Sequence, residues 1–274
     1  MGAFFCIRNI RLDNWLNGLT RILAGTLGSC FLLFLGIPVV ALLLYESPDG
    51  IWFALQEPET LQAIQISIVT TCVSTFLAVL FGLPVAYILA RVHFRWRGVL
   101  ETLVTLPTVF PPVVAGVALL LAFGRMGLVG HYLNIFGITI PFTTPAVILA
   151  QIFVAAPFFV NSAKAGLSQL DRRYELAAYT LRASPLYTFF RVVLPLIRPA
   201  LFAGIGLTWA RALGEFGATI TFAGNFPGVT QTLPIAVYIA SESDLNRAIA
   251  IAIVLLAVSF GVLLALRISW GRRG

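Results

Sequence analysis

Long apolar runs separated by short polar stretches make up most of the chain. A helix needs about 20 mainly apolar residues to cross the roughly 30 Å hydrocarbon core of a bilayer. Six segments meet that length, at about residues 22–45, 61–90, 100–123, 144–163, 199–222 and 247–268. Transmembrane β-barrels are built from short alternating strands, which these uninterrupted runs do not match. The pattern therefore predicts an all-α polytopic membrane protein with six transmembrane helices.

The composition indicates that lipid rather than water surrounds most of the chain. Hydrophobic residues make up 59% of the 274 positions and charged residues 11%, whereas about 25% of the residues of a soluble domain are charged. We expect a single transmembrane domain over residues 1–274, with residues 61–268 as its core. Residues 1–60 add an N-terminal tail, the first span and an outer loop. The first apolar run is about twice as long as a signal-peptide core, so we expect an uncleaved anchor.

The distribution of basic residues predicts which side of the membrane each loop occupies, because short loops rich in Lys and Arg stay cytoplasmic. With six spans and both termini inside, all the basic residues except Arg125, Arg211 and Arg247 lie in cytoplasmic segments. The first outer loop, ESPDGIWFALQEPET, contains acidic residues and no basic one. We therefore predict a cytoplasmic (inner) membrane protein with both termini in the cytoplasm. The net charge of +7 follows from this topology and gives no reason to expect nucleic acid as a partner.

The longest inner connection, residues 164–199, has the pattern of two short amphipathic helices. Asp171 can cap a helix that begins one residue later by accepting hydrogen bonds from free backbone N–H groups. Ser184 followed by Pro185 predicts an N-cap and the first position of a second helix, and two later prolines end that helix and bend the chain into the fifth span. Apolar residues keep helical spacing in both: Leu176, Tyr179, Thr180 and Ala183, then Leu186, Phe189, Phe190 and Val193. On the residues alone, the loop could lie on lipid headgroups or dock onto a protein.

Part of this connection, ELAAYTLRASPLYTFFRVVLPLIRP at residues 175–199, resembles the cytoplasmic EAA loop of ABC importer permeases. The resemblance implies that the loop docks into a groove on an ATP-binding subunit. ATP and magnesium would then be bound by that partner, and no cofactor by this chain. The positions that match are Ala177 and Ala178 after Glu175, then Ala183, Ser184, Pro185, Phe190, Leu194, Pro195 and Pro199.

Two positions depart from the pattern of the family. Its acidic residue stands directly before the two alanines, where this chain has Leu176 and carries Glu175 one residue earlier. Its glycine, four positions after the second alanine, is Arg182 here, and arginine accepts a tight corner less readily than glycine. We expect the docking geometry or the choice of partner to differ accordingly. The residues assigned to ATPase docking are Glu175, Leu176, Ala177, Ala178, Arg182, Ala183, Ser184, Pro185 and Pro195.

Two further strings, residues 105–130 and residues 211–238, resemble the molybdate/tungstate branch of these permeases, to which sulfate permeases are closely related. The combined resemblance covers roughly residues 61–268. It implies the permease subunit of an ATP-driven importer for tetrahedral oxyanions in a prokaryotic inner membrane, with sulfate or thiosulfate as the alternative substrate. Its implied partners are a second copy of the chain, two ABC ATPase subunits and a soluble periplasmic or lipid-anchored substrate-binding protein.

The fifth predicted span contains Arg211 and Glu215, one helical turn apart. A lone charge inside a bilayer is unfavourable, so we expect these two to be paired. The pair could clamp the helix bundle, or it could belong to the pathway next to a gate, together with Gly214 and Gly217. Small residues at every fourth position also predict the close approach of another helix: Gly206, Ala210, Gly214 and Ala218.

Prolines and turn formers mark two other segments. Pro107, Pro111 and Pro112 crowd the third span and are interpreted as a packing feature, with a bent helix lining a path as the alternative. The outer connection at residues 223–247 combines turn formers with an apolar patch. It could receive a soluble partner or form a re-entrant plug.

The sequence offers no pattern for catalysis, and a metal site is not expected. Its cysteines form no spacing motif and its two histidines lie far apart in sequence. The only lysine, Lys164, follows Ala163, so the phosphate-binding pattern G-x-x-x-x-G-K-[ST] is missing. The chain is therefore predicted not to be an enzyme. A self-contained secondary anion carrier is the alternative from another class, but the inverted repeat common in carriers has no convincing second copy here.

Overall fold

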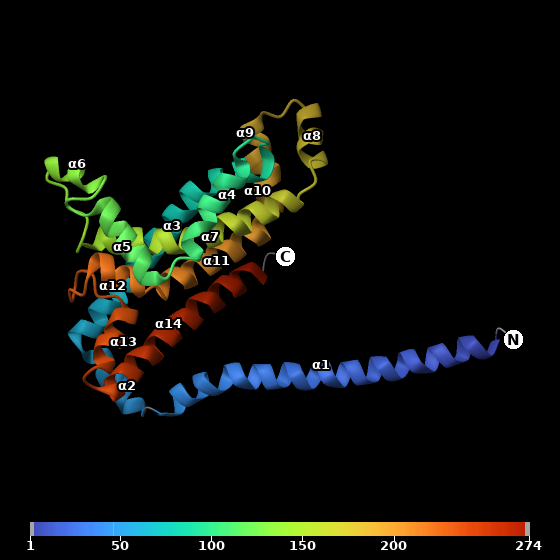
Figure 1. Ribbon diagram of the computed structural model, residues 1–274, viewed down its shortest axis with the longest axis horizontal. Coiled ribbons are helices and arrows are strands. Elements are labelled where there is room, and N and C mark those ends of the chain that lie inside the picture. The colour runs from blue at the N-terminus through green and yellow to red at the C-terminus, as the bar shows by residue number, and fades with distance from the viewer. Residues whose placement is uncertain (1–2, 46, 272–274) are drawn as a thin grey trace. The chain divides into compact units, whose positions relative to one another are not determined.

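The computed structural model describes residues 3–45 and 47–271, and the regular elements in that part are all helices, with no strand. The chain divides into two compact units, Met1–Pro48 and Asp49–Gly274. The first unit consists of one long helix, α1 (Ala3–Tyr45) (Figure 1). Its segment Thr20–Tyr45 is long and apolar enough to cross a membrane. The apolar side chains of that segment are exposed within the unit, with Leu32 and Phe34 each at 70%, which is the state expected of a helix that faces lipid.

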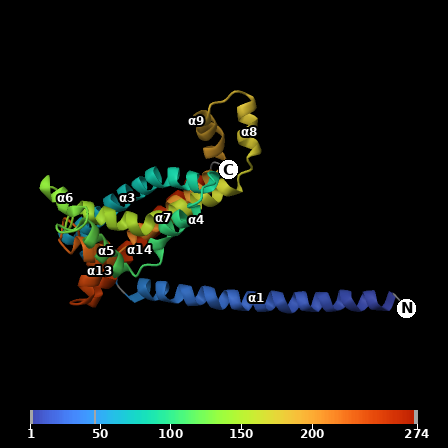
Figure 2. The same ribbon diagram turned by 45° about the horizontal axis from the view of Figure 1, so that its top comes forward.

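The second unit contains the remaining elements in short and long pieces. The long helices are α3 (Pro58–Arg91), α7 (Thr144–Gln169), α11 (Arg198–Leu213) and α14 (Leu245–Gly271). The shorter elements are α2 (Pro48–Gln56), α4 (Arg97–Thr105), the 3-10 helix η1 (Leu106–Thr108), α5 (Pro112–Phe123), α6 (Gly130–Ile135), α8 (Arg173–Thr180), α9 (Pro185–Thr188), the π-helix η2 (Phe189–Val193), α10 (Leu194–Leu196), α12 (Gly217–Ala223) and α13 (Leu233–Ser241). α8 and α9 lie at one end of this unit and α13 at the other (Figures 1 and 2).

Four of the six predicted spans are continuous helices, in α1, α3, α7 and α14. The other two are bent, so the described residues provide up to six crossings only if each bent pair counts as one. The third, predicted over residues 100–123, turns by 114° between Arg97–Thr108 and Pro112–Phe123. Pro111 and Pro112 lack the N–H groups that would continue the helix. The prolines therefore coincide with a sharp bend, and Pro112 also takes part in helix packing, as described below.

The fifth predicted span, residues 199–222, is also not one helix. α11 ends at Leu213, Gly214 caps it, and α12 starts at Gly217. At its other end, α11 meets Pro185–Leu196 at an angle of 73°, which agrees with the bend expected near Pro195 and Pro199. The predicted stripe of small residues is corrected by the first break, because Gly214 and Ala218 do not continue the helix that carries Gly206 and Ala210.

The core of the second unit forms around α7, which packs against α3 and α11. Small residues allow α7 and α11 to approach each other closely. A Cβ added to Gly204 on α11 would lie 2.9 Å from the Cβ of Ser162 on α7. One added to Gly166 on α7 would lie 2.5 Å from the Cβ of Ala200. Close approach of another helix was therefore correctly expected for α11, and Gly204, which lies outside the predicted stripe, is one of the residues that allow it.

The bent third span and the broken fifth span pack against each other through α5 and α12. A Cβ on Gly217 would lie 2.5 Å from the Cβ of Pro112, and one on Gly116 would lie 2.6 Å from the Cβ of Thr221. These glycines leave no room for a side chain, so the two helix breaks fit together. Gly217, a predicted pathway residue, is buried in this contact.

Candidate functional site

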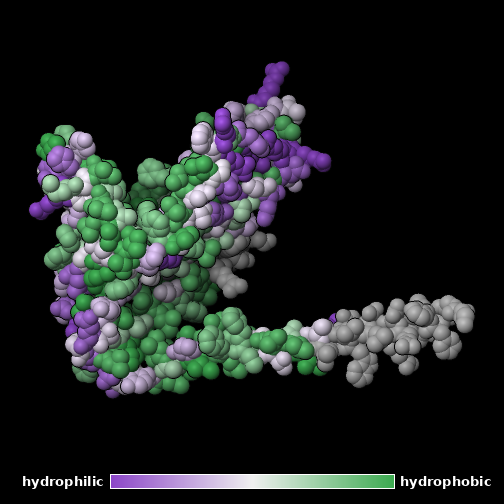
Figure 3. Space-filling model, viewed as in Figure 1, coloured by the Kyte–Doolittle hydropathy of each residue, from purple (hydrophilic) through white to green (hydrophobic). Residues whose placement is uncertain are grey.

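The basic loop at the end of the second unit, residues 170–197, begins with α8. The Oδ1 atom of Asp171 accepts a hydrogen bond of 2.9 Å from the N–H of Arg173. Asp171 thus supplies the predicted carboxylate, and the helix begins one residue later than predicted. Hydrophilic side chains gather on the surface over α8 and α9 (Figure 3).

The end of α8 explains the departure at Arg182. The N–H of Arg182 donates to the carbonyl of Tyr179 at 2.9 Å, and the N–H of Ala183 donates to the carbonyl of Ala178 at 3.1 Å. This pair of bonds is the Schellman motif, whose left-handed position glycine normally occupies. Arg182 takes that conformation, with φ of 60°, at a cost of about 1 kcal/mol. The tight corner is therefore kept although the glycine is missing.

The second helix of the loop starts as predicted and continues differently. The Oγ atom of Ser184 accepts a hydrogen bond of 3.3 Å from the N–H of Tyr187, and Pro185 occupies the first helical position. After Thr188 the helix widens into the π-helix η2. Val193 of η2 and Ile197 after it are buried with residues of α3 and α7, so the end of the loop is anchored in the core.

A buried ion pair fastens the first half of the loop. The Nη2 atom of Arg91, the last residue of α3, lies 2.6 Å from the Oε1 atom of Glu175, and both side chains are largely buried. The same guanidinium donates to the carbonyl of Leu170 at 3.1 Å, and Arg172 donates to the carbonyl of Arg91 at 2.9 Å. The carboxylate of Glu175 therefore faces the interior of the chain, and α8 is attached to α3.

The opposite surface of the loop is free within the chain. The face predicted for the first helix does not pack internally, since the side chains of Leu176 and Tyr179 are 60% and 41% exposed. Of the assigned docking residues, Glu175 is buried, Ala178, Ala183 and Pro195 are half-buried, and the rest are exposed. The loop thus offers a surface of exposed apolar side chains with exposed arginines between them: Leu176, Leu181, Arg182, Leu186, Tyr187 and Arg191.

Arg211 and Glu215 are paired, as predicted. The Nη1 atom of Arg211 lies 2.7 Å from the Oε2 atom of Glu215, whose side chain is 1% exposed. The Oε1 atom of Glu215 accepts a hydrogen bond of 2.9 Å from the N–H of Ala218. The carboxylate thus connects the last turn of α11 to the first turn of α12, where a negative charge is favourable next to free N–H groups. Gly214 lies in the break between these turns and is exposed.

Two polar connections between distant segments were not found from the sequence. One is the Arg91–Glu175 pair. The other joins α7 to α3, where the Nε2 atom of the buried Gln151 donates to the Oγ1 atom of Thr70 at 3.2 Å. Ser67 on the same face of α3 accepts a hydrogen bond of 2.7 Å from the N–H of Leu233. Hydroxyl residues at helical spacing in the second span (67, 70, 71, 74 and 75) were the available signal.

Comparison with known proteins places this arrangement in a family. Residues 78–269 match the model of the binding-protein-dependent transport system inner membrane component. The chain belongs to that family. The match contains the basic loop, both ion pairs and every predicted site residue, and the predicted resemblance to importer permeases is confirmed.

Relatives within the family share most of the length of the chain. It is 43% identical over 233 residues to the molybdenum transport system permease protein ModB of Mycobacterium tuberculosis, covering 85% of this chain and 88% of that one. It is 35% identical over 264 residues to the sulfate transport system permease protein CysT of Salmonella typhimurium, covering 93% and 95%.

Solved structures of the same fold are more distant in sequence. A bacterial ABC transporter involved in the import of the acidic polysaccharide alginate matches with a TM-score of 0.76 at 19% identity, over 98% of this chain and 99% of that one. The methionine ABC transporter MetNI in an inward-facing form matches with a TM-score of 0.59 at 19% identity, over 82% and 96%. These matches confirm the fold class of an ABC importer permease.

Proposed function

We propose that the chain is the membrane-spanning permease subunit of an ATP-driven importer of molybdate or tungstate. The observation that carries this proposal is the 43% identity to permeases named for molybdenum transport, over 85% of the chain. The sulfate permease CysT, at 35% identity, supports a tetrahedral oxyanion in general and makes sulfate the second candidate. In this proposal a separate partner subunit hydrolyses ATP and the chain itself does not.

The working complex consists of two copies of the chain around one pore, two ABC ATPase subunits and a substrate-binding protein. Both termini of the chain lie in the cytoplasm, because this orientation also puts the arginines of the basic loop there. The exposed surface around Leu176 and Leu181 docks onto the ATPase subunit. Glu175 does not contribute directly, since its carboxylate is taken up by Arg91. It positions the helix that docks.

The attachment of the loop explains how a movement of the ATPase reaches the spans. α8 is joined to α3 by the Arg91–Glu175 pair, and η2 is packed into the core that α3 shares with α7. A displacement of the loop therefore moves these helices with it. The broken span at Arg211 and Glu215 is a place where the backbone can change direction at the cost of few hydrogen bonds, and we assign it to the gate region.

Reconstitution tests the function and its two alternatives. The chain is placed in proteoliposomes with its ATPase subunit and binding protein, and uptake of labelled molybdate is followed with tungstate or sulfate as competitor. We expect ATP-dependent uptake that tungstate inhibits and sulfate inhibits weakly. Strong inhibition by sulfate would assign the chain to sulfate transport. Uptake by the chain alone, driven by an ion gradient, would show a secondary carrier.

The docking surface has its own test, with two leucine substitutions of the same kind. Leu176→Asp places a charge on the exposed face of α8, whereas Leu128→Asp places one on a leucine that is also exposed, at 81%, in the connection before α6. We expect Leu176→Asp alone to reduce retention of the ATPase subunit in pull-down, because a buried unpaired charge opposes docking. Normal retention by Leu176→Asp would move the docking surface elsewhere.

A further inference from the structure

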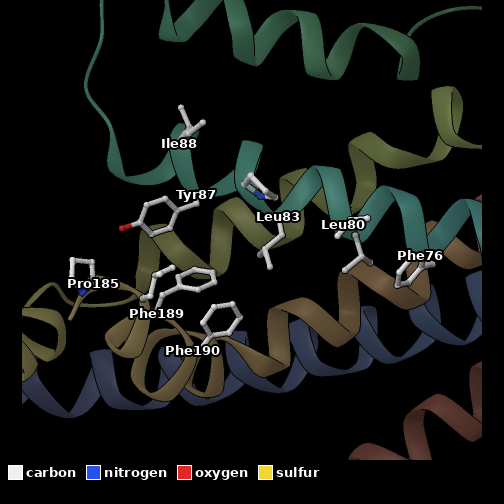
Figure 4. A pocket seen from close by; sticks show the side chains of 11 residues that line it. Phe76, Leu80, Leu83, Tyr87, Ile88, Pro185, Phe189 and Phe190 are labelled. Atoms are coloured by element: carbon white, nitrogen blue, oxygen red, sulfur yellow. The ribbon is translucent and has the colours of Figure 1, made fainter. Parts of the chain in front are cut away.

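An apolar slot runs along α3 where this helix faces the second half of the basic loop (Figure 4). Its volume is about 600 Å³, within the range of about 300–1,000 Å³ found for ligand pockets. α3 contributes Leu80, Leu83 and Tyr87, and the loop contributes Leu186 and Phe190. Within the second unit Leu80, Leu186 and Phe190 remain 51%, 73% and 58% exposed. So large an apolar surface requires an apolar occupant.

The length of the slot matches one lipid chain. Its lining on α3 extends from Phe76 to Ile88, which is about 18 Å of helix at about 1.5 Å per residue. One leaflet of a bilayer provides hydrocarbon to a depth of about 15 Å, half of the whole core. α3 is itself a helix that can cross the membrane, and the slot occupies the part of it next to the charged end at Arg91. A chain that enters at this end reaches the far end of the slot near the middle of the bilayer.

The end of the slot next to Arg91 is polar and positively charged. Tyr87 lines the slot one turn of α3 before Arg91, and the guanidinium of Arg172 reaches the backbone carbonyl of Arg91. The charge of Glu175 is balanced by Arg91. In the described part of the chain, Arg172 donates to a backbone carbonyl and no carboxylate forms an ion pair with it. One positive charge and one hydroxyl therefore remain at the entrance.

We propose that the slot binds an anionic phospholipid, with one acyl chain along α3 and the phosphate at Arg172 beside the hydroxyl of Tyr87. An apolar groove with a basic entrance at the membrane boundary suits this ligand, because each arginine near the surface attracts anionic headgroups. One wall of the slot belongs to the loop, so the bound lipid braces the loop against α3. The proposal depends on the membrane position of α3 and not on the transported anion.

Native mass spectrometry of the purified chain in detergent tests this proposal. Dioleoyl phosphatidylglycerol is added, with dioleoyl phosphatidylcholine as the uncharged comparison of equal chain length. We expect one phosphatidylglycerol molecule to be retained with about a fivefold preference over phosphatidylcholine, the contribution of one arginine near a headgroup. Arg172→Gln is expected to abolish that preference, while Arg173→Gln at the neighbouring, 90% exposed position keeps it.

Two matched pairs of substitutions test the acyl chain. Leu80→Trp fills the slot, and Leu61→Trp changes a leucine on α3 that is equally exposed, at 51%, and does not line it. Leu186→Ser removes apolar lining, and Leu181→Ser changes an exposed leucine of the same loop outside the slot. We expect retention of both lipids to fall at least about fivefold in the first member of each pair. Since Leu186 is 73% exposed, its replacement leaves folding intact.

Several results would overturn the proposal. They are equal retention of the two lipids by the unmodified chain, equal effects of both members of a pair, and unchanged binding in Leu186→Ser. A photoreactive group in place of Leu80 gives a further check in membranes. Crosslinks to lipid are expected, whereas crosslinks to a peptide would show that a transmembrane helix occupies the slot instead. None of these outcomes depends on transport, so the proposed function is tested separately.

Discussion

The two buried ion pairs of the second unit have the same chemistry and different tasks. Arg211 and Glu215 are four residues apart and connect two consecutive helices across a break, inside a predicted span. Arg91 and Glu175 are far apart in sequence and connect the end of a long helix to a surface loop. The first pair defines the shape of one segment, whereas the second fixes the position of a segment relative to the core. Removal of either ion pair should therefore affect the stability of the chain and the coupling of ATP hydrolysis to transport to different degrees.

The largest effect on stability is expected at the broken span. Arg211→Leu leaves the carboxylate of Glu215, 1% exposed, without its cation, which should lower the free energy of unfolding by about 2–3 kcal/mol. The double variant Arg211→Leu/Glu215→Leu should recover about 1 kcal/mol, because no charge is stranded. Recovery should stop there, since the N–H of Ala218 loses its acceptor. Thermal unfolding in detergent measures these differences.

Transport by the double variant decides between a clamp and a gate. If the pair belongs to the gate region, the well-folded double variant should bind its ATPase and transport poorly. Glu215→Gln is the control, because it keeps an oxygen for the N–H of Ala218 and removes only the charge. Full transport by the double variant would reduce the pair to a structural clamp. Additive effects of Arg211→Leu and Glu215→Leu on unfolding would contradict the pairing itself.

The Arg91–Glu175 pair should show the reverse balance, with a smaller loss of stability and a larger loss of coupling between ATP hydrolysis and transport. Glu175→Gln removes a charged hydrogen bond, which should lower the free energy of unfolding by about 1–2 kcal/mol. The exposed docking surface is untouched, so the ATPase subunit should still be retained in pull-down. Transport per ATP hydrolysed should fall, because α8 is no longer held to α3. Simultaneous measurement of uptake and phosphate release gives this ratio.

Charge exchange provides the control for that pair. Arg91→Glu/Glu175→Arg restores an ion pair of opposite polarity and should recover part of the coupling that Arg91→Glu alone loses. Loss of ATPase retention in Glu175→Gln would instead mean that Glu175 contacts the partner directly, as the resemblance to the EAA loop first implied. A coupling ratio equal to that of the unmodified chain would show that the packing of η2 is sufficient to transmit the movement.

Local signals in the sequence predicted local structure well. Asp171, Ser184 and Pro185 act within three residues of themselves, and the structure shows them near the ends of the helices where they were expected. The spacing of Arg211 and Glu215 predicted their pairing because one helical turn brings such positions together. The pair forms although the helix ends between the two residues, and the second oxygen of Glu215 accepts a hydrogen bond from the first turn of α12.

Long-range features were not accessible in the same way. Arg91 is one of many basic residues on its side of the chain, and nothing in the spacing distinguishes it as the partner of Glu175. The break at Gly214 is also weakly marked, since a glycine in an apolar helix is common in membranes. Hydropathy rises and falls over about 20 residues and does not register a break of three. The break brings Gly217 into close contact with Pro112, a long-range contact that no local pattern predicts.

The smallest expected effect concerns the corner between the two halves of the loop, and it has the opposite sign. Arg182 holds a left-handed backbone, with φ of 60°, that is unfavourable for a residue with a Cβ atom. Arg182→Gly should therefore raise the stability of the loop by up to about 1 kcal/mol, less the entropy that glycine gains in the unfolded chain. Hydrogen exchange at the N–H groups of Arg182 and Ala183, which close the motif, measures the change locally.

Arg182→Ala is the control, because it removes the charge and keeps the strain. If glycine acts only by relieving the backbone strain, hydrogen exchange should slow in Arg182→Gly and not in Arg182→Ala. Both variants lack the arginine side chain, so any affinity for the ATPase that depends on it should fall equally in the two. Slower exchange in both would mean that the arginine side chain, and not its backbone, destabilises the corner.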